Sequence, residues 1–288
     1  MRELVVLSGK GGTGKTTVCG NLAVLASSKV MADCDVDAAN LYLLLDPVLK
    51  SSSPFYGLKK ATINREKCLG CNLCLHLCRY DAIGPGFVVD PVLCEGCTVC
   101  YHACPCGAVE MIEHVAGHLF LSDTRYGPLV HARLGIAEDN SGKLVAAVRK
   151  EARRLAEEGT KELIITDGPP GIGCPAISCL SGADLVLVVA EPTFSGRHDL
   201  ERVLELAKHF GCRAAVCINK WDLEPENTRA LESLCNRYSV PVVGYLPYDE
   251  SVMEAVKGGR PVIQECSGPM EEGILALWDE LKALLELR

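Results

Sequence analysis

The feature that most constrains the fold is a series of short, nearly continuous apolar runs that alternate with helical patterns. The strand-length runs cover residues 4–7, 163–166, 185–189, 214–218 and 240–243. Two of the helical segments cover residues 145–158 and 197–209. Strands that are apolar on both faces are typical of a parallel sheet with helices on both sides. The sequence therefore predicts an α/β fold with a doubly wound, mostly parallel sheet.

Between residues 58 and 113 this pattern gives way to an internally duplicated, cysteine-rich segment. It contains two quartets of cysteines, the first at Cys68, Cys71, Cys74 and Cys78 and the second at Cys94, Cys97, Cys100 and Cys104. A shift of 26 residues superimposes the first quartet on the second. A duplicated unit inside an alternating chain indicates an inserted module. We therefore expect a first part at 1–57, an insert at 58–113 and a second part at 114–288, with linkers at 51–57 and 113–117.

The spacing C-x₂-C-x₂-C-x₃-C, present twice, is that of bacterial-type ferredoxins with two [4Fe–4S] clusters. In these proteins each cluster takes three thiolates from one run and the fourth from the other. We predict one cluster on Cys68, Cys71, Cys74 and Cys104, and a second on Cys78, Cys94, Cys97 and Cys100. A zinc ribbon would separate two C-x₂-C pairs by a longer loop. The insert is expected to be a small α+β domain.

Residues 9–16 read GKGGTGKT and satisfy the phosphate-loop pattern G-x-x-x-x-G-K-[ST] between an expected strand and an expected helix. In such a loop, backbone N–H groups and the helix N-terminus converge on phosphate. Lys15 is expected to reach the β and γ phosphates, and Thr16 to ligate Mg²⁺. The other residues expected at the nucleotide in this loop are Gly11, Gly12, Thr13, Gly14 and Thr17.

Acidic side chains follow two of the expected strands beside this loop. Asp33, Asp35 and Asp37 lie in MADCDVDAANL, and Asp167 ends a strand just before a Gly/Pro turn. Carboxylates so close together repel one another unless a cation organises them. Asp167 is expected at the Walker B position, holding Mg²⁺ directly or through water, and Asp33 in the outer shell of the same ion. Asp37 has the alternative interpretation of a helix cap.

A third strand ends in CINKWDL, where we expect Asn219 to contact the base. With Asp222 this segment also spells N-K-x-D, the guanine-reading motif of many GTPases. A motif this short carries a risk of false matches. From these residues alone, ATP and GTP both remain possible.

The loop GKGGTGKTT resembles the deviant Walker A loop of the MinD/ParA/Mrp family of P-loop ATPases. The resemblance implies that Lys10 crosses a dimer interface to the partner's nucleotide, much as an arginine finger does. It also implies that Asp35 orients the attacking water and that residues 168–171 sense the γ-phosphate. It favours adenine as the base, with residues 247–251, including Pro247 and Asp249, closing the base pocket.

Together with the insert, the chain resembles MinD-superfamily P-loop NTPases that carry a ferredoxin domain. The implied cofactors are ATP, Mg²⁺ and two [4Fe–4S] clusters. ATP binding would close a homodimer, partner-stimulated hydrolysis would reopen it, and the cycle would gate electron transfer or cluster delivery to a protein partner. The alternatives are a MinD/ParA-like positioning ATPase with structural or sensory clusters, and a plain ferredoxin with an inactive nucleotide fold. Intact Lys15, Thr16, Asp35 and Asp167 argue against the last.

Cys174 stands apart from the two quartets. It lies seven residues beyond Asp167, just past the Gly/Pro turn. In this position it resembles the switch II cysteine of the nitrogenase iron protein, which shares one cluster across a dimer. The alternative is a buried thiol at the start of a helix. Residues 122–143, which follow the insert, are expected to form a hairpin that leads into a helix.

Composition and hydropathy argue against nucleic acid and membranes as binding partners. A net charge of -8 without a basic run argues against direct binding of nucleic acid. The apolar stretch LVVL is too short for a secretory signal, and the run at 185–190 is too short to span a membrane. The segment 271–288 has one apolar stripe and an acidic opposite face, which favours a docked helix over a membrane anchor. Seventeen cysteines imply a reducing compartment, so we expect a cytoplasmic protein.

Overall fold

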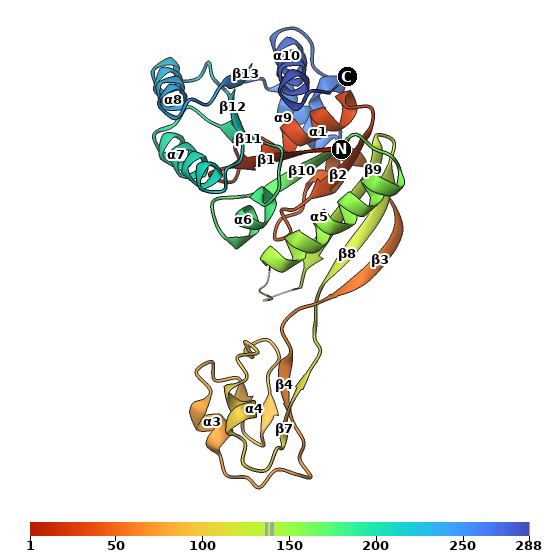
Figure 1. The fold of residues 1–288 in the computed structure, drawn as a ribbon, viewed down its shortest axis with the longest axis vertical. Helices are drawn as coiled ribbons and strands as arrows, with labels where there is room; N and C mark the ends of the chain where they lie inside the picture. Colours follow the sequence, from red (N-terminus) through yellow and green to blue (C-terminus); the bar gives the residue numbers. More distant parts are fainter. Residues whose placement is uncertain (136–137, 139–140, 288) are drawn as a thin grey trace. The chain divides into compact units, whose positions relative to one another are not determined.

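The computed structural model describes residues 1–135, 138 and 141–287, and the chain divides into two compact units (Figure 1). The larger unit consists of Met1–Ser52, Leu119–Arg133 and Ser141–Arg288. The smaller unit consists of Ser53–His118 and Leu134–Asn140. Each unit has its own strands and its own group of buried apolar residues.

The larger unit is built on a sheet with the strand order β13-β12-β11-β1-β10-β2-β9-β8-β3. Its strands are β1 (Arg2–Ser8), β2 (Lys29–Asp33), β3 (Val48–Tyr56), β8 (Val115–Thr124), β9 (Gly127–Leu134), β10 (Leu163–Pro170), β11 (Leu185–Ala190), β12 (Ala214–Asn219) and β13 (Val242–Leu246). All neighbours from β13 through to β9 pair in parallel. The predicted parallel α/β sheet is confirmed, and all five predicted apolar runs are strands of it.

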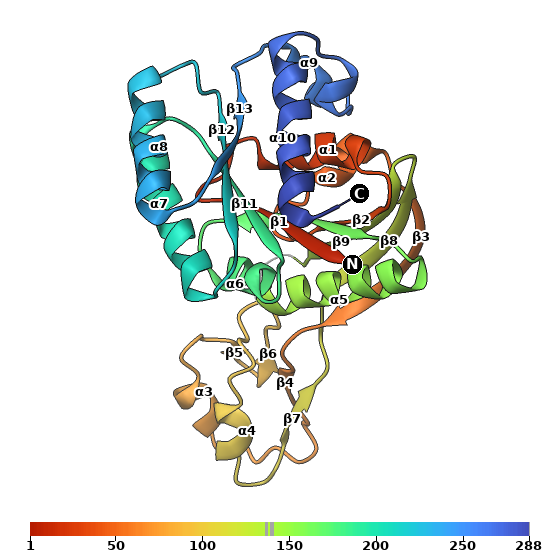
Figure 2. The same cartoon turned by 45° about the horizontal axis from the view of Figure 1, so that its top comes forward.

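Helices cover both faces of this sheet (Figure 2). They are α1 (Lys15–Leu25), α2 (Leu41–Leu45), α5 (Ser141–Glu158), α6 (Cys174–Leu180), α7 (Phe194–His209), α8 (Pro225–Tyr238), α9 (Ser251–Lys257), the 3₁₀ turn η1 (Val262–Gln264) and α10 (Pro269–Leu285). In β1, Leu4 and Val6 pack in the cluster that contains α1 and α10, whereas Val5 and Leu7 are equally buried but lie outside that cluster. Successive side chains of a strand point to opposite faces, so both faces of β1 are covered.

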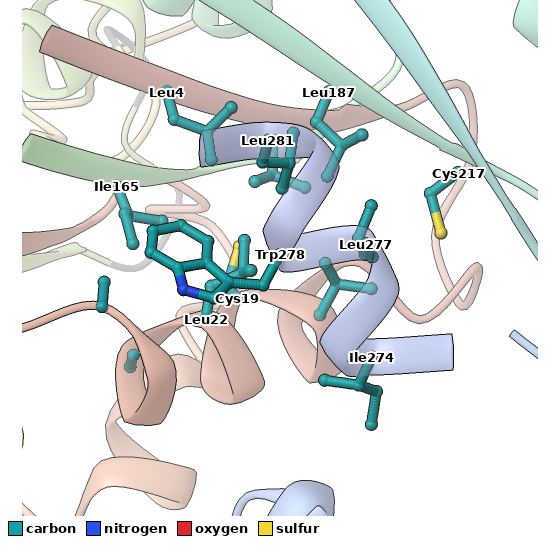
Figure 3. Packing of buried hydrophobic residues seen from close by; sticks show 14 of the residues in the cluster. Leu4, Cys19, Leu22, Ile165, Leu187, Cys217, Ile274, Leu277, Trp278 and Leu281 are labelled. Atoms are coloured by element: carbon teal, nitrogen blue, oxygen red, sulfur yellow. The ribbon is translucent and has the colours of Figure 1, made fainter. Parts of the chain in front are cut away.

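The last helix is docked on the sheet rather than free. Its apolar stripe is buried, and Figure 3 shows Leu277, Trp278 and Leu281 of α10 close to Leu4 and Leu187 of the sheet. The predicted docked helix is therefore confirmed, because the apolar face that a membrane would need is already inside the core. Across the described ranges, none of the helices is long and apolar enough to cross a membrane.

The smaller unit repeats one β-α-β pattern twice. Its elements are β4 (Lys60–Ile63), α3 (Leu73–Leu77), β5 (Ile83–Gly84), β6 (Val88–Val89), α4 (Val99–Ala103) and β7 (Val109–Ile112). The outer strands β4 and β7 pair antiparallel, and so do the inner strands β5 and β6. Gly70 and Gly96, which occupy equivalent places in the two repeats, both have positive φ. The duplication seen in the sequence is therefore present in the backbone as well.

The two segments expected as linkers are strands instead. β3 runs to Tyr56, and β8 begins at Val115. The serines and Pro54 of β3 are exposed, so no apolar alternation marks the strand in the sequence. Its backbone nevertheless pairs with β8, and pairing satisfies N–H and C=O groups whatever the side chains are.

The segment after the insert forms the expected hairpin. β8 and β9 are neighbours in the sheet and are joined by Arg125 and Tyr126. The Thr124 hydroxyl donates to the carbonyl of Gly127 (2.8 Å) and accepts from the N–H of Tyr126 (3.0 Å), which closes the turn. The hairpin leads towards α5, although residues 136–137 and 139–140 of the 122–143 segment lie outside the described residues.

Removing a core side chain of α10 tests this docking. Leu281 is completely buried, so Leu281→Ala should lower the free energy of unfolding by about 2–5 kcal/mol, through lost burial and the cavity left behind. Leu275 on the same helix is 41% exposed, and Leu275→Ala should change it by less than about 0.5 kcal/mol. Urea unfolding measures both variants, and equal losses would contradict the docked arrangement.

Candidate functional site

The phosphate loop lies between the end of β1 and the start of α1. Gly12 and Gly14 have φ of 83° and 91°, a region that L-residues with a side chain rarely occupy. A Cβ at Gly14 would lie 2.4 Å from Nδ2 of Asn219. That amide donates to the carbonyl of Thr13 (2.8 Å), so Asn219 fixes the loop from the end of β12.

A cleft of about 680 Å³ opens over this loop. It is lined by every loop residue expected at the nucleotide, together with Asp35, and these are Gly11, Gly12, Thr13, Gly14, Lys15, Thr16, Thr17 and Asp35. Pro169 and Pro170, which follow Asp167, line the same cleft. The structure thus brings the glycine loop, Asp35 and the end of β10 together around a space that a nucleotide phosphate tail can enter. The prediction that the strand ends at Asp167 is wrong, because β10 continues to Pro170, which pairs with Ser8.

Lys15 is paired with two carboxylates at the floor of this site. Its Nζ lies 2.7 Å from Oδ1 of Asp167 and 3.7 Å from Oδ2 of Asp35, and its side chain is 6% exposed. Burial acts to lower the pKa of Lys15, but the attraction of Asp167, with a smaller contribution from Asp35, outweighs burial and raises it. Lys15 is therefore a fixed positive charge.

The other oxygen of Asp167 marks a place where a cation fits. Oδ2 of Asp167 is buried and has no hydrogen-bond partner in the described part of the chain. A buried carboxylate oxygen without a donor is costly unless a cation or water reaches it. Carboxylate and hydroxyl oxygens are the ligands that Mg²⁺ prefers. Asp167 and Thr16 of the phosphate loop therefore fit a magnesium ion.

Asp33 takes a different place from the one expected beside magnesium. It is fully buried, and its two carboxylate oxygens accept from the N–H groups of Asp35 (3.2 Å) and Leu41 (3.1 Å). Burial and the nearby charge of Asp167 raise the pKa of Asp33 to about 8. These contacts make Asp33 an anchor for the segment that carries Asp35. Its place in an outer magnesium shell stays a prediction.

Asp37 does not cap a helix. It is exposed and lines the cleft, whereas the N-cap residue of α2 is Asn40. The helix-cap interpretation of Asp37 is therefore wrong, because the chain makes a turn at 36–38 and enters the helix only at Leu41.

Lys10 is directed away from the cleft of its own chain. Its Nζ lies 3.3 Å from Oγ1 of Thr193 and 3.5 Å from Oε2 of Glu191, and its side chain is 32% exposed. Glu191 also pairs with Lys220. Glu191 is not among the residues predicted for the site, although it follows the apolar run at 185–190 as Asp167 follows the run at 163–166. The crossing of Lys10 to a partner stays a prediction.

The residues expected around the base are only partly brought together. Asn219 contacts the phosphate loop, but Pro247 lines a separate depression with Trp221 and Tyr245. Oδ1 of Asp249 accepts from the N–H of Ser251 (2.8 Å). Neither Pro247 nor Asp249 lines the main cleft.

The base itself therefore stays a prediction. The guanine-motif residue Asp222 accepts from the N–H of Tyr248 (2.7 Å), which occupies one of its carboxylate oxygens. Adenine stays the base that the resemblance to the MinD/ParA/Mrp family predicts.

In the smaller unit, four thiols line one small cavity, and they are the set predicted for the second cluster, Cys78, Cys94, Cys97 and Cys100. In the first set, burial raises the pKa of the Cys74 thiol, and the nearby Cys68 and Cys71 add to the shift. Across residues 1–135, 138 and 141–287, however, no three His, Cys, Asp or Glu side chains lie in metal-binding geometry. The clusters therefore stay a prediction.

Two further cysteines bear on this assignment. Sγ of Cys104, predicted for the first cluster, lies 3.7 Å from Sγ of Cys106. Cys174 is exposed and is the first residue of α6. The interpretation of Cys174 as a buried thiol is therefore wrong, since its side chain is exposed to solvent. The next residue, Pro175, lines the cleft over the phosphate loop.

The raised pKa of Asp33 predicts a specific pH dependence in the absence of nucleotide and Mg²⁺. Its folded pKa of about 8 lies above the unfolded value of about 3.9, so the folded state holds the proton more tightly. The stabilisation is complete below pH 4 and is lost as pH rises to 8, at up to about 1.4 kcal/mol per pH unit. Asp33→Asn does not titrate, so its unfolding free energy relative to wild type should increase from pH 5 to 8. A constant difference would show that Asp33 is already ionised.

Three comparisons place this site among known proteins. The CobQ/CobB/MinD/ParA nucleotide binding domain matches residues 4–262. An uncharacterised protein of Methanocaldococcus jannaschii is 32% identical over 286 residues, which are 98% of this chain and 97% of that protein. The septum site-determining protein MinD of Synechocystis is 26% identical over 275 residues, 92% of this chain and 82% of its own length.

A solved structure shares the fold. MinD of Pyrococcus horikoshii in complex with Mg-ADP is 20% identical, with a TM-score of 0.61, and the match covers 98% of this chain and 96% of that one. The chain belongs to the CobQ/CobB/MinD/ParA family of nucleotide-binding proteins.

Proposed function

We propose that the chain is a nucleotide-operated switch that binds Mg·ATP in the cleft of the larger unit and hydrolyses it. The observation that carries this proposal is the buried Lys15 ammonium between Asp167 and Asp35 beneath the glycine loop. Phosphate oxygens would replace part of the carboxylate contact of Lys15, while the loop amides and the start of α1 receive the remaining charge.

Each residue around the cleft has a separate role in the proposed reaction. Thr16 and Asp167 would hold Mg²⁺, which supplies neutralisation of phosphate charge when bound. Asp35, half-buried at the rim, would orient a water towards the γ-phosphate. Lys10, which faces Thr193 within its own chain, would complete the site of a second copy. The proposed active form is therefore a homodimer with one nucleotide in each chain.

The similarity to MinD favours a switch that controls association with protein partners over one that drives electron transfer. MinD of Synechocystis is named for septum-site determination, and the nucleotide binding domain of the family matches residues 4–262 of this chain. Since the apolar face of α10 is packed in the core, a protein partner suits this chain better than a membrane surface. We propose that ATP-bound dimers recruit this partner and that hydrolysis releases it.

Mixing two inactive variants tests hydrolysis and the role of Lys10 together. Lys10→Ala and Asp35→Asn should each bind ATP but hydrolyse it at least about 100-fold more slowly, as expected when a charge-stabilising or water-orienting group is lost. In a mixed dimer, the Lys10→Ala chain keeps Asp35 and receives Lys10 from its partner. An equal mixture should therefore recover about a quarter of wild-type phosphate release, because half of the C₂ dimers contain one intact site.

The matched control is Asp279→Asn, which removes an exposed acid of α10 outside the cleft and should keep near wild-type activity. Absence of recovery in the mixture would show that Lys10 acts within its own chain. Wild-type protein that neither binds nor hydrolyses ATP would overturn the proposed function as a whole.

A second candidate function concerns the smaller unit, which we propose holds two [4Fe–4S] clusters. It is supported by the cavity lined by Cys78, Cys94, Cys97 and Cys100, and by the duplicated turns around Gly70 and Gly96. Thiols are the ligands that such clusters require, and thiolates crowded together repel unless iron is bound between them. The clusters would supply one-electron chemistry or a redox signal to the nucleotide switch.

Iron analysis of anaerobically prepared protein checks this candidate. The wild-type chain should contain about eight iron atoms, and Cys71→Ser and Cys97→Ser, at equivalent exposed positions of the two repeats, should each lose about half. Cys212→Ser, outside both quartets, serves as the control and should lose none. If Cys174 shares a further cluster between two copies, Cys174→Ala should lower the iron content per dimer. Zinc in place of iron would contradict the assignment.

A further inference from the structure

A buried lysine distinguishes the two cysteine quartets from each other. Lys60 lies in β4, and its side chain is 9% exposed. Its Nζ donates to the backbone carbonyl of Cys94 (2.8 Å), and the N–H of the next residue, Ala61, lies 3.5 Å from Sγ of Cys94. Cys94, itself buried, is therefore approached by a full positive charge and by an amide donor from the same strand.

The cations beside the other quartet are exposed rather than buried. Arg65 donates to the carbonyl of Gly86 and Lys67 precedes Cys68, but both side chains are exposed, so solvent and salt screen their charges. The shift of 26 residues that relates the repeats places Gly86 at the position of Lys60 and Cys68 at the position of Cys94. Gly86 has no side chain, so the contact between Lys60 and Cys94 has no equivalent at Cys68. The duplication is symmetric in its thiols and in its turns, but it is not symmetric in charge.

The countercharge of Lys60 is shared with another group. Oε2 of Glu138 lies 3.6 Å from Nζ of Lys60, while Oε1 lies 2.7 Å from Nε2 of His114. Glu138 is as buried as Lys60. The ammonium is hydrogen-bonded to the backbone of Cys94, whereas the side-chain contacts of Glu138 are with Lys60 and His114. The positive end of this ion pair is therefore the end that adjoins the quartet around Cys94.

We propose that Lys60 raises the reduction potential of the cluster bound by Cys78, Cys94, Cys97 and Cys100, so that this cluster accepts the first electron. The proposal rests on the second candidate function above. In the step, [4Fe–4S]²⁺ takes one electron from a low-potential one-electron donor and becomes [4Fe–4S]⁺, with no bond or proton exchanged. The added negative charge is stabilised by a nearby buried ammonium, and net charge and hydrogen bonds to sulfur are established determinants of such potentials.

An anaerobic redox titration of the full chain with dithionite, followed by electron paramagnetic resonance, tests this proposal. Wild-type protein should show two one-electron couples. Lys60→Met should lower only the upper couple, decreasing its reduced-to-oxidised ratio at a fixed potential at least tenfold, which is about 59 mV for one electron. The control is Lys59→Met, which removes the same charge from an exposed neighbour and should leave both couples unchanged.

Two further variants keep the test decisive if Lys60→Met folds poorly. Glu138→Gln removes the countercharge and should raise the same couple, a shift opposite in sign. Lys60→Arg preserves the charge and should keep the couple near its wild-type value. Cys97→Ser and Cys71→Ser assign the couples, since each should disturb the cluster of its own repeat.

The outcomes separate this inference from the candidate function on which it rests. Two clusters whose couples respond equally to Lys60→Met and Lys59→Met, or an upper couple that belongs to the Cys71 repeat, would overturn the role of Lys60 and leave the clusters in place. A chain that binds no iron would overturn both.

Discussion

The nucleotide site depends on the buried ion pair between Lys15 and Asp167. Taking two charges out of water is costly, and the pair is tolerated because its oxygen and nitrogen lie 2.7 Å apart and Asp35 lies close by. The pair also joins the start of α1 to the end of β10, two elements that are distant in sequence. An incoming phosphate would meet a lysine that is already desolvated, and it would replace part of the contact between Lys15 and the carboxylates.

Much of the larger unit could be predicted because its signals are local and strong. Continuous apolar runs identified the buried parallel strands, and the spacing of GKGGTGKT identified the loop whose residues line the cleft. The exposed strand β3 carries no such signal, because its side chains do not have to be apolar when only the backbone is paired. The strand β8 has buried residues but no continuous apolar run. The sequence therefore indicated the core of the sheet but not its far edge.

The roles of individual acidic residues depend on the directions of their side chains, which cannot be read from the spacing of the residues in the sequence. Asp33 and Asp35 are separated by one residue, yet one is an inward anchor for Leu41 and the other faces the cleft. Glu191 became visible only when the fold placed it beside Lys10. In the smaller unit, the quartets were evident from spacing alone, whereas the contact of Lys60 with Cys94 became visible only in the structure, which brings β4 of the first repeat beside the second repeat.

The strand β3 closes one side of the nine-stranded sheet and leaves a row of backbone groups without a neighbouring strand. An exposed edge strand of this kind can pair with a strand of another molecule and so lead to fibril growth. Three features of β3 oppose such pairing. Pro54 has no backbone N–H to donate, Lys50 carries a charge, and three consecutive serines stand where β-branched residues would favour a further strand. The serine stretch that was expected as a linker therefore has a further consequence, since it makes this edge a poor template for pairing with another molecule.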